Sequence, residues 1–186
     1  ALSILDMQVD DKTPLVFVDL ETTGTSPKHH RVIEVGILRV EGGTVTAEYK
    51  TLVNPGVPVP PFVASLTGIN SSMLVDAPSF DEVALEVSEL LDGGLFIAHS
   101  AGFDYGFLGE EFRRLGMQFA YPFLCTAKLS LALFPKQLSH NLDTLLERFA
   151  LDAVDRHSAL DYAYVLYQFL QIADAAVGTP TLHEHM

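Results

Sequence analysis

The apolar positions of the chain alternate between runs typical of β-strands and spacings typical of α-helices. Residues 15–20 (LVFVDL) form a short apolar run rich in β-formers. Residues 32–40 and 45–52 continue this pattern on either side of the turn Glu41-Gly42-Gly43-Thr44. These three segments predict an antiparallel meander.

The second part of the chain predicts helices that alternate with short strands. Apolar residues recur every three or four positions in the helical segments, whereas the strand segments are brief apolar runs. The predicted helices are residues 80–91, 107–115, 127–134, 142–149 and about 157–177, and the predicted strands are residues 95–98 and 123–125. The sequence therefore predicts an α/β fold with a mixed five-stranded sheet, an antiparallel meander plus parallel strands, flanked by helices.

A chain of 186 residues without internal repeats predicts one domain. We expect an N-terminal tail over residues 1–12, a domain over residues 13–178 and a C-terminal tail over residues 179–186. No apolar run approaches the roughly 20 residues that cross a bilayer, and the first residues are acidic where an export signal is basic. The expectation is a cytoplasmic protein without a membrane contact.

The charge balance narrows the classes of function. The chain has 11 Lys and Arg against 24 Asp and Glu, a net charge of −13. Proteins that hold long nucleic acids by their own field are usually basic, so this class is disfavoured. Excess carboxylate instead suits solubility, the binding of hard cations, or a partner that delivers a polyanionic substrate.

Cysteine and histidine usage excludes two further kinds of site. The single cysteine, Cys125, cannot form an internal disulfide and is expected in the core of a protein from a reducing compartment. The seven histidines lack the spacing of a zinc site outside the C-terminal tail, so we predict none. His29 and His30 lie beside Pro27 in a predicted turn and are expected at the surface.

Three acidic clusters carry the candidate chemistry. Asp19 and Glu21 are two apart at a strand end, so their carboxylates share one face; a solvated strand end is the plain alternative. Asp104 follows a predicted strand at the start of a helix, where a helix N-cap is the alternative. His157 and Asp161 are four apart and share a helix face, where a structural pair is the alternative.

Taken together, the three clusters resemble the motifs of the DnaQ-like DEDDh family of 3′–5′ exonucleases. The strings are VDLETTG at residues 18–24, HSAGFD at residues 99–104 and RHSALD at residues 156–161. The resemblance spans nearly the whole chain and implies an RNase H-like fold. It also implies that Asp19, Glu21, Asp104 and Asp161 hold two Mg²⁺ or Mn²⁺ ions that clamp the scissile phosphate. His157 would be the general base, and the product would be a nucleoside 5′-monophosphate.

The resemblance also implies a set of substrate contacts. Gly24 would allow close approach of the terminal nucleotide, and two apolar side chains would support the terminal bases. The implied substrate-binding residues are Leu20, Thr22, Thr23, Gly24, Ile69, His99 and Phe103. For His99 a hydrogen-bonded structural role, and for Phe103 a place in the core, are the alternatives. A small cationic rim formed by Lys128, Lys136, Arg148 and Arg156 is a further expectation, with scattered surface charge as its alternative.

Two positions depart from the family pattern. Asp161 follows His157 by four residues where the DEDDh pattern has five, a difference of about 100° around a helix. Ser100 stands where the family commonly has Asn.

The leading hypothesis is a proofreading-type exonuclease that acts on single-stranded or frayed DNA ends, with a DNA polymerase subunit as a candidate partner. An exoribonuclease that trims RNA 3′ ends, and a catalytically weak nucleic-acid or polymerase-binding module, are the alternatives.

Overall fold

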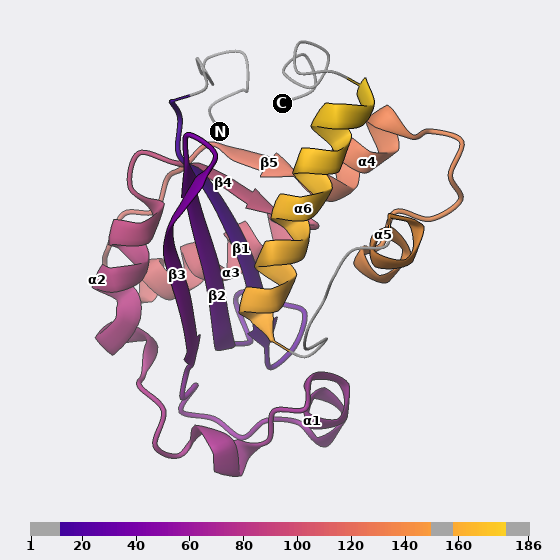
Figure 1. Cartoon of the computed structure of the whole chain (residues 1–186). Helices are drawn as coiled ribbons and strands as arrows, with labels where there is room; N and C mark the ends of the chain where they lie inside the picture. Colours follow the sequence, from indigo (N-terminus) through magenta and orange to yellow (C-terminus); the bar gives the residue numbers. More distant parts are fainter. Residues whose placement is uncertain (1–11, 150–157, 178–186) are drawn as a thin grey trace.

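A mixed five-stranded sheet forms the centre of the protein (Figure 1), as predicted. The structure, a computed structural model, describes residues 12–149 and 158–177. The strands lie in the order β3-β2-β1-β4-β5. Strands β1 (Leu15–Thr22), β2 (Val32–Glu41) and β3 (Thr44–Leu52) form the antiparallel meander. Strand β4 (Leu95–Ala98) runs parallel to β1, and β5 (Phe123–Cys125) runs parallel to β4.

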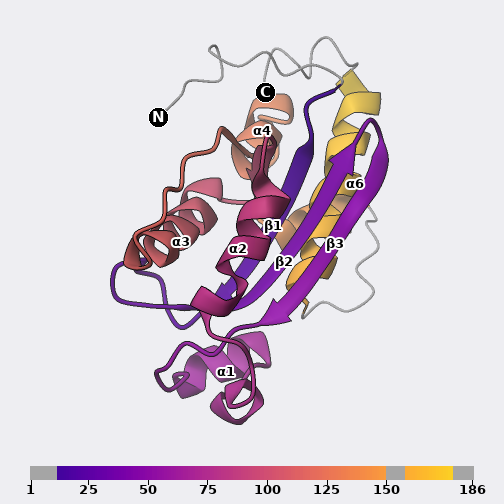
Figure 2. The same cartoon turned by 90° about the vertical axis from the view of Figure 1, so that its left-hand side faces the viewer.

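Helices cover both faces of the sheet (Figure 2). Helices α2 (Phe80–Leu91) and α3 (Ala101–Arg114) lie on one face, and α4 (Thr126–Leu133), α5 (Leu142–Arg148) and α6 (Ala159–Val177) lie on the other. The two layers agree with the helices that the apolar spacing predicted. In the part of the chain that the structure describes, no helix has both the length and the apolar character that a membrane span requires.

Strand β1 supplies both halves of the core because successive side chains point to opposite faces. Val18 and Leu20 pack into the cluster under α2 and α3, whereas Phe17 packs into the cluster under α6. Asp19 and Glu21 follow Phe17 on its face. The acidic pair therefore continues a buried apolar row at the end of the strand.

Two short elements between β3 and α2 were not predicted. Helix α1 (Pro61–Thr67) and the 3₁₀ turn η2 (Ser71–Leu74) lie beyond the strand ends, at the bottom of Figure 1. They enclose a small separate core that contains Ile33 and Ile69. Helix α3 also begins at Ala101, before Asp104, whereas the apolar spacing that predicted it starts at residue 107. The predicted start of the last helix at residue 157 lies outside the described residues.

Candidate active site

The end of β1 carries the first two acids of the site. Asp19 is cross-strand from Gly36 of β2, and Glu21 is cross-strand from Glu34. A bulge follows directly, between Glu21 and Thr22, and ends the regular pairing. Because side chains two apart share a face, both carboxylates project toward the side of the sheet that α6 covers.

Asp104 comes to the same end of the sheet from the neighbouring strand. Because β4 runs parallel to β1, the carboxyl ends of both strands lie at one edge, and α3 begins directly after β4. Asp104 lies in the first turn of α3 and is buried. The N-cap position belongs to Ser100, so Asp104 is not the helix cap that its position alone allowed. The positive end of the helix dipole favours an acid in this turn.

Asp19, Glu21 and Asp104 lie close enough for their charges to interact. Burial raises the pKa of Asp19 well above its ordinary value, and the charges of Asp104, Glu21 and Glu34 raise it further. Burial raises the pKa of Asp104 as well, although the backbone amides of Asp104 and Leu20 donate hydrogen bonds that oppose the shift. Burial, with a contribution from Glu34, raises the pKa of Glu21 to about 7. At neutral pH these carboxylates repel one another unless a proton or a cation lies between them.

The raised pKa values of these acids predict how the stability of the metal-free protein depends on pH. The folded protein binds a proton at Glu21 more tightly than the unfolded chain, because its pKa is raised from 4.5 to about 7. That contribution is complete below the unfolded pKa and is lost as the pH rises through the folded pKa. Thermal unfolding in a chelator should therefore show that Glu21→Gln raises Tm relative to wild type more at about pH 8 than at about pH 5. Equal Tm differences at the two pH values would contradict the cluster.

Asp161 lies in the first turn of α6, whose start is packed against β2. A Cβ added at Gly36 would lie 2.2 Å from the backbone of Ala159 and Leu160, so only glycine lets the helix approach this closely. Gly36 is the direct cross-strand partner of Asp19. The packing therefore brings the helix start that carries Asp161 next to the strand that carries Asp19.

The structure describes only one of the two catalytic residues predicted in the third motif. Asp161 is half-buried, and His157 lies outside the described residues, so its role as general base stays a prediction. Over residues 12–149 and 158–177, no three acidic, histidine or cysteine side chains already form a common metal cage. The structure thus gathers Asp19, Glu21 and Asp104 electrostatically without closing their oxygens around one point.

The segment after β1 is a tight, internally bonded loop. The Thr22 hydroxyl donates to the Gly24 carbonyl over 2.7 Å, and the Thr23 hydroxyl accepts from the Arg31 amide over 2.9 Å. A Cβ at Gly24 would lie 2.5 Å from the ring of His30, so this glycine is required by the packing of His30. His29 is exposed, as expected, whereas His30 is half-buried and its ring accepts the Ser26 amide through Nδ1.

His99 is held by hydrogen bonds on both ring nitrogens. Nε2 donates to the carbonyl of His140 over 2.7 Å, and Nδ1 lies at hydrogen-bond distance, 2.9 Å, from the Thr126 hydroxyl oxygen. Burial lowers the pKa of His99, which favours the neutral ring. The structural alternative for His99 thus accounts for both nitrogens, and a contact with substrate stays a prediction.

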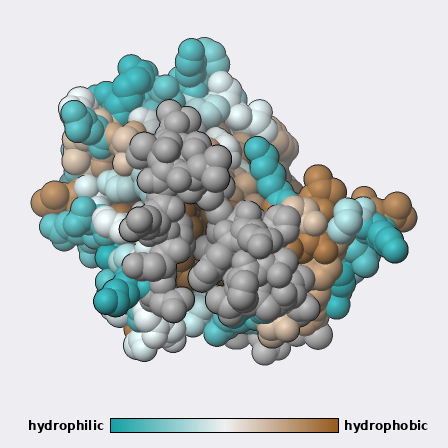
Figure 3. Space-filling view, turned by 90° about the horizontal axis from the view of Figure 1, so that it is seen from above, coloured by the Kyte–Doolittle hydropathy of each residue, from teal (hydrophilic) through white to brown (hydrophobic). Residues whose placement is uncertain are grey.

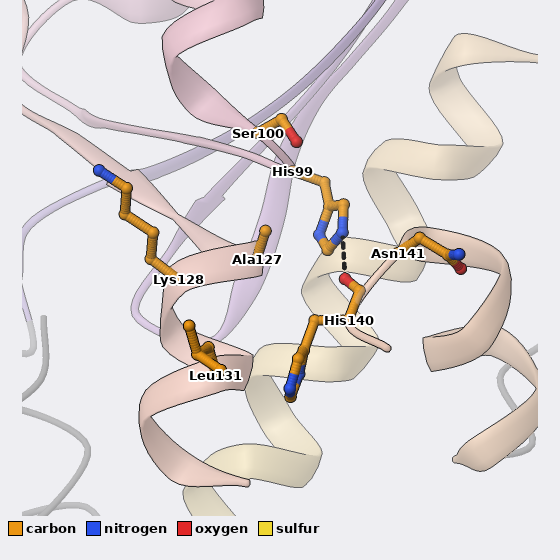
Figure 4. A pocket seen from close by; sticks show the side chains of 7 residues that line it. All are labelled: His99, Ser100, Ala127, Lys128, Leu131, His140 and Asn141. Carbon is orange, nitrogen blue, oxygen red and sulfur yellow. Dashed lines mark hydrogen bonds between the residues drawn. The ribbon is translucent and has the colours of Figure 1, made fainter. Parts of the chain in front are cut away.

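A hollow of about 430 Å³ opens beside His99, between the start of α3, helix α4 and the segment before α5 (Figure 4). Figure 4 shows the His99 ring directed at the His140 carbonyl, with Asn141 beyond it. The hollow is lined by His99, Ser100, Ala127, Lys128, Leu131, His140 and Asn141. It therefore borders the second motif, next to the helix that carries Asp104.

Ser100 adopts a strained conformation at the start of this helix. Its φ of 60° and ψ of 55° are left-handed, and its side chain makes no capping hydrogen bond. Asparagine tolerates this region better than serine. Ser100→Asn should raise the free energy of unfolding by about 0.5–1 kcal/mol, measured by urea titration. Ser100→Ala should give no gain, and a gain equal to that of Ser100→Asn would show that strain is not the cause.

The two predicted base-contacting side chains lie in different surroundings. Phe103 is 36% exposed and packs against Phe107 with ring centroids 4.7 Å apart, so part of its side chain is accessible. Ile69 is only 3% exposed and belongs to the small core below the sheet, where it offers little surface to a base. Leu20 is also buried, although its backbone amide contributes to the acidic cluster.

The predicted cationic rim is only partly present. Arg148 is used internally, because Nη2 donates to the Ser139 carbonyl over 2.7 Å and the guanidinium lies over the Phe149 ring. Lys128 and Lys136 are exposed, and Arg156 lies outside the described residues. Two apolar residues on the same side, Leu131 and Leu138, are also exposed. Hydrophobic groups project on the side where α4 and α5 lie (Figure 3).

Two buried acids near the site escaped the sequence analysis. Glu34 of β2 is 4% exposed, and the sequence signal for it was a carboxylate within the apolar run of residues 32–38. Glu111 of α3 is 1% exposed and accepts both arms of the Arg31 guanidinium at 2.8 and 2.9 Å. It also accepts the Val32 amide, so it joins α3 to the segment that follows the β1 loop. No local spacing connects Glu111 with residues about eighty positions earlier.

Comparison with known proteins identifies relatives by sequence. Residues 16–170 match a family described as Exonuclease. The chain is 34% identical over 148 residues to a PolC-type DNA polymerase III of Caldanaerobacter subterraneus. The matched region covers 80% of this chain and 11% of that protein. It is 36% identical over 151 residues to the 3′-5′ exonuclease DinG of Bacillus subtilis. This matched region covers 80% of this chain and 16% of that protein. The chain thus spans a small part of these relatives.

Solved structures show the same fold at lower identity. Escherichia coli exonuclease I in complex with a dA16 oligonucleotide superposes with a TM-score of 0.80 at 16% identity, covering 93% of this chain and 42% of that one. Exonuclease X in complex with 5′ overhanging duplex DNA superposes with a TM-score of 0.72 at 22% identity, covering 88% and 93%. The RNase H-like fold is therefore confirmed. With a family match over most of its length and the acids of the first two motifs in one cluster, the chain belongs to the DnaQ-like exonuclease family.

Proposed function

We propose that this domain removes nucleotides from the 3′ ends of single-stranded or frayed DNA by metal-dependent hydrolysis. The observation that carries the proposal is the cluster of Asp19, Glu21 and Asp104 at the carboxyl ends of two parallel strands. Such a cluster is unfavourable alone at neutral pH and becomes favourable when cations are bound. At this acidic cluster, binding of the anionic substrate therefore depends on binding of the cations, and the reverse.

The donor set fits divalent metal ions. Asp19 Oδ2 is buried and finds no hydrogen-bond partner among the described residues, although buried polar atoms are nearly always paired. Carboxylate oxygens are the ligands that Mg²⁺ and Mn²⁺ prefer. Asp19, Glu21, Asp104 and Asp161 would hold the two ions, which would polarise the scissile phosphate and activate water.

The chain's own residues would position the reacting groups. His157 is proposed to accept the proton of the attacking water, which a neutral imidazole can do near neutral pH. The exposed part of Phe103, one residue before Asp104, would support a terminal base by stacking. The bonded loop formed by Thr22, Thr23 and Gly24 would border the terminal nucleotide.

We favour DNA as the substrate because the names of the relatives and the ligands of the solved structures both include DNA. PolC-type enzymes are named as DNA polymerases, and exonucleases I and X were solved with DNA. The net charge of −13 favours a tethered domain or a partner that holds the strand, and a polymerase polypeptide fits this role. We propose that the domain works in such an assembly, in the cytoplasm.

Digestion of matched oligonucleotides tests the proposal. A 5′-labelled single strand of DNA, the same strand in a blunt duplex and the same sequence in RNA would be incubated separately with Mg²⁺, Mn²⁺ and Zn²⁺. The expected result is a ladder of products shortened from the 3′ end, fastest on single-stranded DNA with Mg²⁺ or Mn²⁺. Faster shortening of RNA would support the exoribonuclease, and binding without shortening would support the non-catalytic module.

A further inference from the structure

The buried carboxylate of Glu34 lies between the strand that carries Asp19 and Glu21 and the helix that carries Asp161. Glu34 is cross-strand from Glu21, and its side chain is on the same face of the sheet. It is 4% exposed, in a strand whose other inward positions are apolar or glycine. A buried carboxylate costs free energy unless it accepts hydrogen bonds or faces a positive charge. The surroundings of Glu34 therefore indicate what it does.

Glu34 accepts a hydrogen bond from the start of α6. Its Oε1 accepts the backbone N–H of Ala159, the first residue of the helix. The first amides of a helix have no partner within the helix, and the helix dipole favours a negative charge there. Glu34 satisfies both requirements from a strand that is 125 residues away in the sequence.

Gly36 fixes the distance of the same contact. The backbone of Ala159 and Leu160 occupies the space in which a Cβ at Gly36 would lie, with separations of 2.2 Å. Glu34 and Gly36 are two apart and share one face of β2. One strand thus provides a hydrogen-bond acceptor and a steric stop for the helix start, two residues before Asp161.

We propose that Glu34 is a positioning residue, which together with Gly36 seats the start of α6 so that Asp161 reaches the metal-binding acids of β1. The inference rests on the proposed metal site of the function above. The register of β2 against β1 makes this seat effective, because Gly36 pairs with Asp19 and Glu34 pairs with Glu21. A shift of the helix start would move Asp161 relative to both acids. The seat also explains how the third motif can be placed by tertiary contacts in addition to its own spacing.

Two substitutions at Glu34 separate the hydrogen bond from the charge. Glu34→Gln keeps an oxygen at the same reach and removes the charge, whereas Glu34→Asp keeps the charge and withdraws the oxygen by one methylene. Mn²⁺ titration of the full chain by calorimetry should show affinity close to wild type for Glu34→Gln and about tenfold weaker affinity for Glu34→Asp. Amide hydrogen exchange at Ala159 should become faster only in Glu34→Asp.

Gly36→Ala is an independent test that leaves Glu34 in place. It should weaken Mn²⁺ binding as Glu34→Asp does, and in both variants kcat should fall with little change in KM for the oligonucleotide. Wild-type Mn²⁺ affinity in Glu34→Asp and Gly36→Ala, with only a lower Tm, would overturn the inference in favour of a merely structural role. Weak binding in Glu34→Gln as well would also overturn it, because charge and not position would then be the cause.

The outcome is separable from the proposed function. A wild-type protein that binds Mn²⁺ but does not shorten DNA would contradict the exonuclease, while the affinity pattern of the variants would still decide the role of Glu34. A protein that shortens DNA equally well in all variants would contradict the role of Glu34 alone.

Discussion

Asp19→Asn should lower the rate of nucleotide release by about 10³-fold or more, because metal-ion catalysis supplies several kcal/mol of transition-state stabilisation. Asp19 is central to the cluster, since its Oδ2 is buried without a partner among the described residues and its pKa is raised by burial and by the other acids. The metal-free variant should unfold at the same temperature as wild type or higher, because the substitution relieves like-charge repulsion. Loss of activity would then be separated from loss of fold.

The measurement is single-turnover cleavage of a labelled single strand, paired with thermal unfolding in a chelator. Asp92→Asn is the matched control. Asp92 is an exposed aspartate that lies before β4, whereas Asp104 of the acidic cluster lies after β4. The control should cleave at the wild-type rate. Unchanged turnover in Asp19→Asn would contradict the role of Asp19 in holding metal.

Glu111→Ala should lower the free energy of unfolding by about 3 kcal/mol, near the lower end of the about 3–5 kcal/mol expected for a broken buried ion pair. The lower end applies because Arg31 retains 32% exposure, whereas Glu111 has 1%. Its removal leaves the Val32 amide and the Arg31 guanidinium without this acceptor, and Arg114 loses an ion pair. The segment after the β1 loop would lose its attachment to α3.

Urea titration at constant protein concentration measures this difference. Glu110→Ala is the control on the neighbouring position, because Glu110 forms an ion pair with Arg113, which is 68% exposed. Exposed pairs of this kind contribute little, so the control should stay close to wild type. A small effect in Glu111→Ala would show that solvent replaces the pair at low cost.

Strands β1, β2 and β4 were predictable because each contains a buried apolar run, whereas β3, whose residues are exposed or half-buried, was predicted from the turn that precedes it. Helix α1 was not, since it buries only Val63 and Thr67 while Phe62 and Leu66 stay 67% and 77% exposed. It therefore has no core-facing stripe of the kind that apolar spacing detects. The early start of α3 was missed because Gly102 and Gly106 weaken the helical signal in its first turns.

In the candidate site too, some residues were predictable from local sequence and others were not. The spacing of Asp19 and Glu21 was sufficient to place both on one face, because strand geometry is local. Bringing Asp104 to them required the parallel pairing of β4 with β1, which the motif resemblance implied and the topology confirms. Glu34 and Gly36 act through a contact with α6 that no local pattern encodes. Long-range polar contacts of this kind set the site but leave little periodic signal.

Anomalous diffraction from crystals soaked with Mn²⁺ and a nucleoside 5′-monophosphate tests the central claim most directly. The account predicts Mn²⁺ peaks within ligand distance of Asp19, Glu21 and Asp104, with the phosphate bound to the ions and Asp161 among the ligands. Peaks elsewhere on the protein, or no peak at these carboxylates at a concentration that supports cleavage, would contradict it.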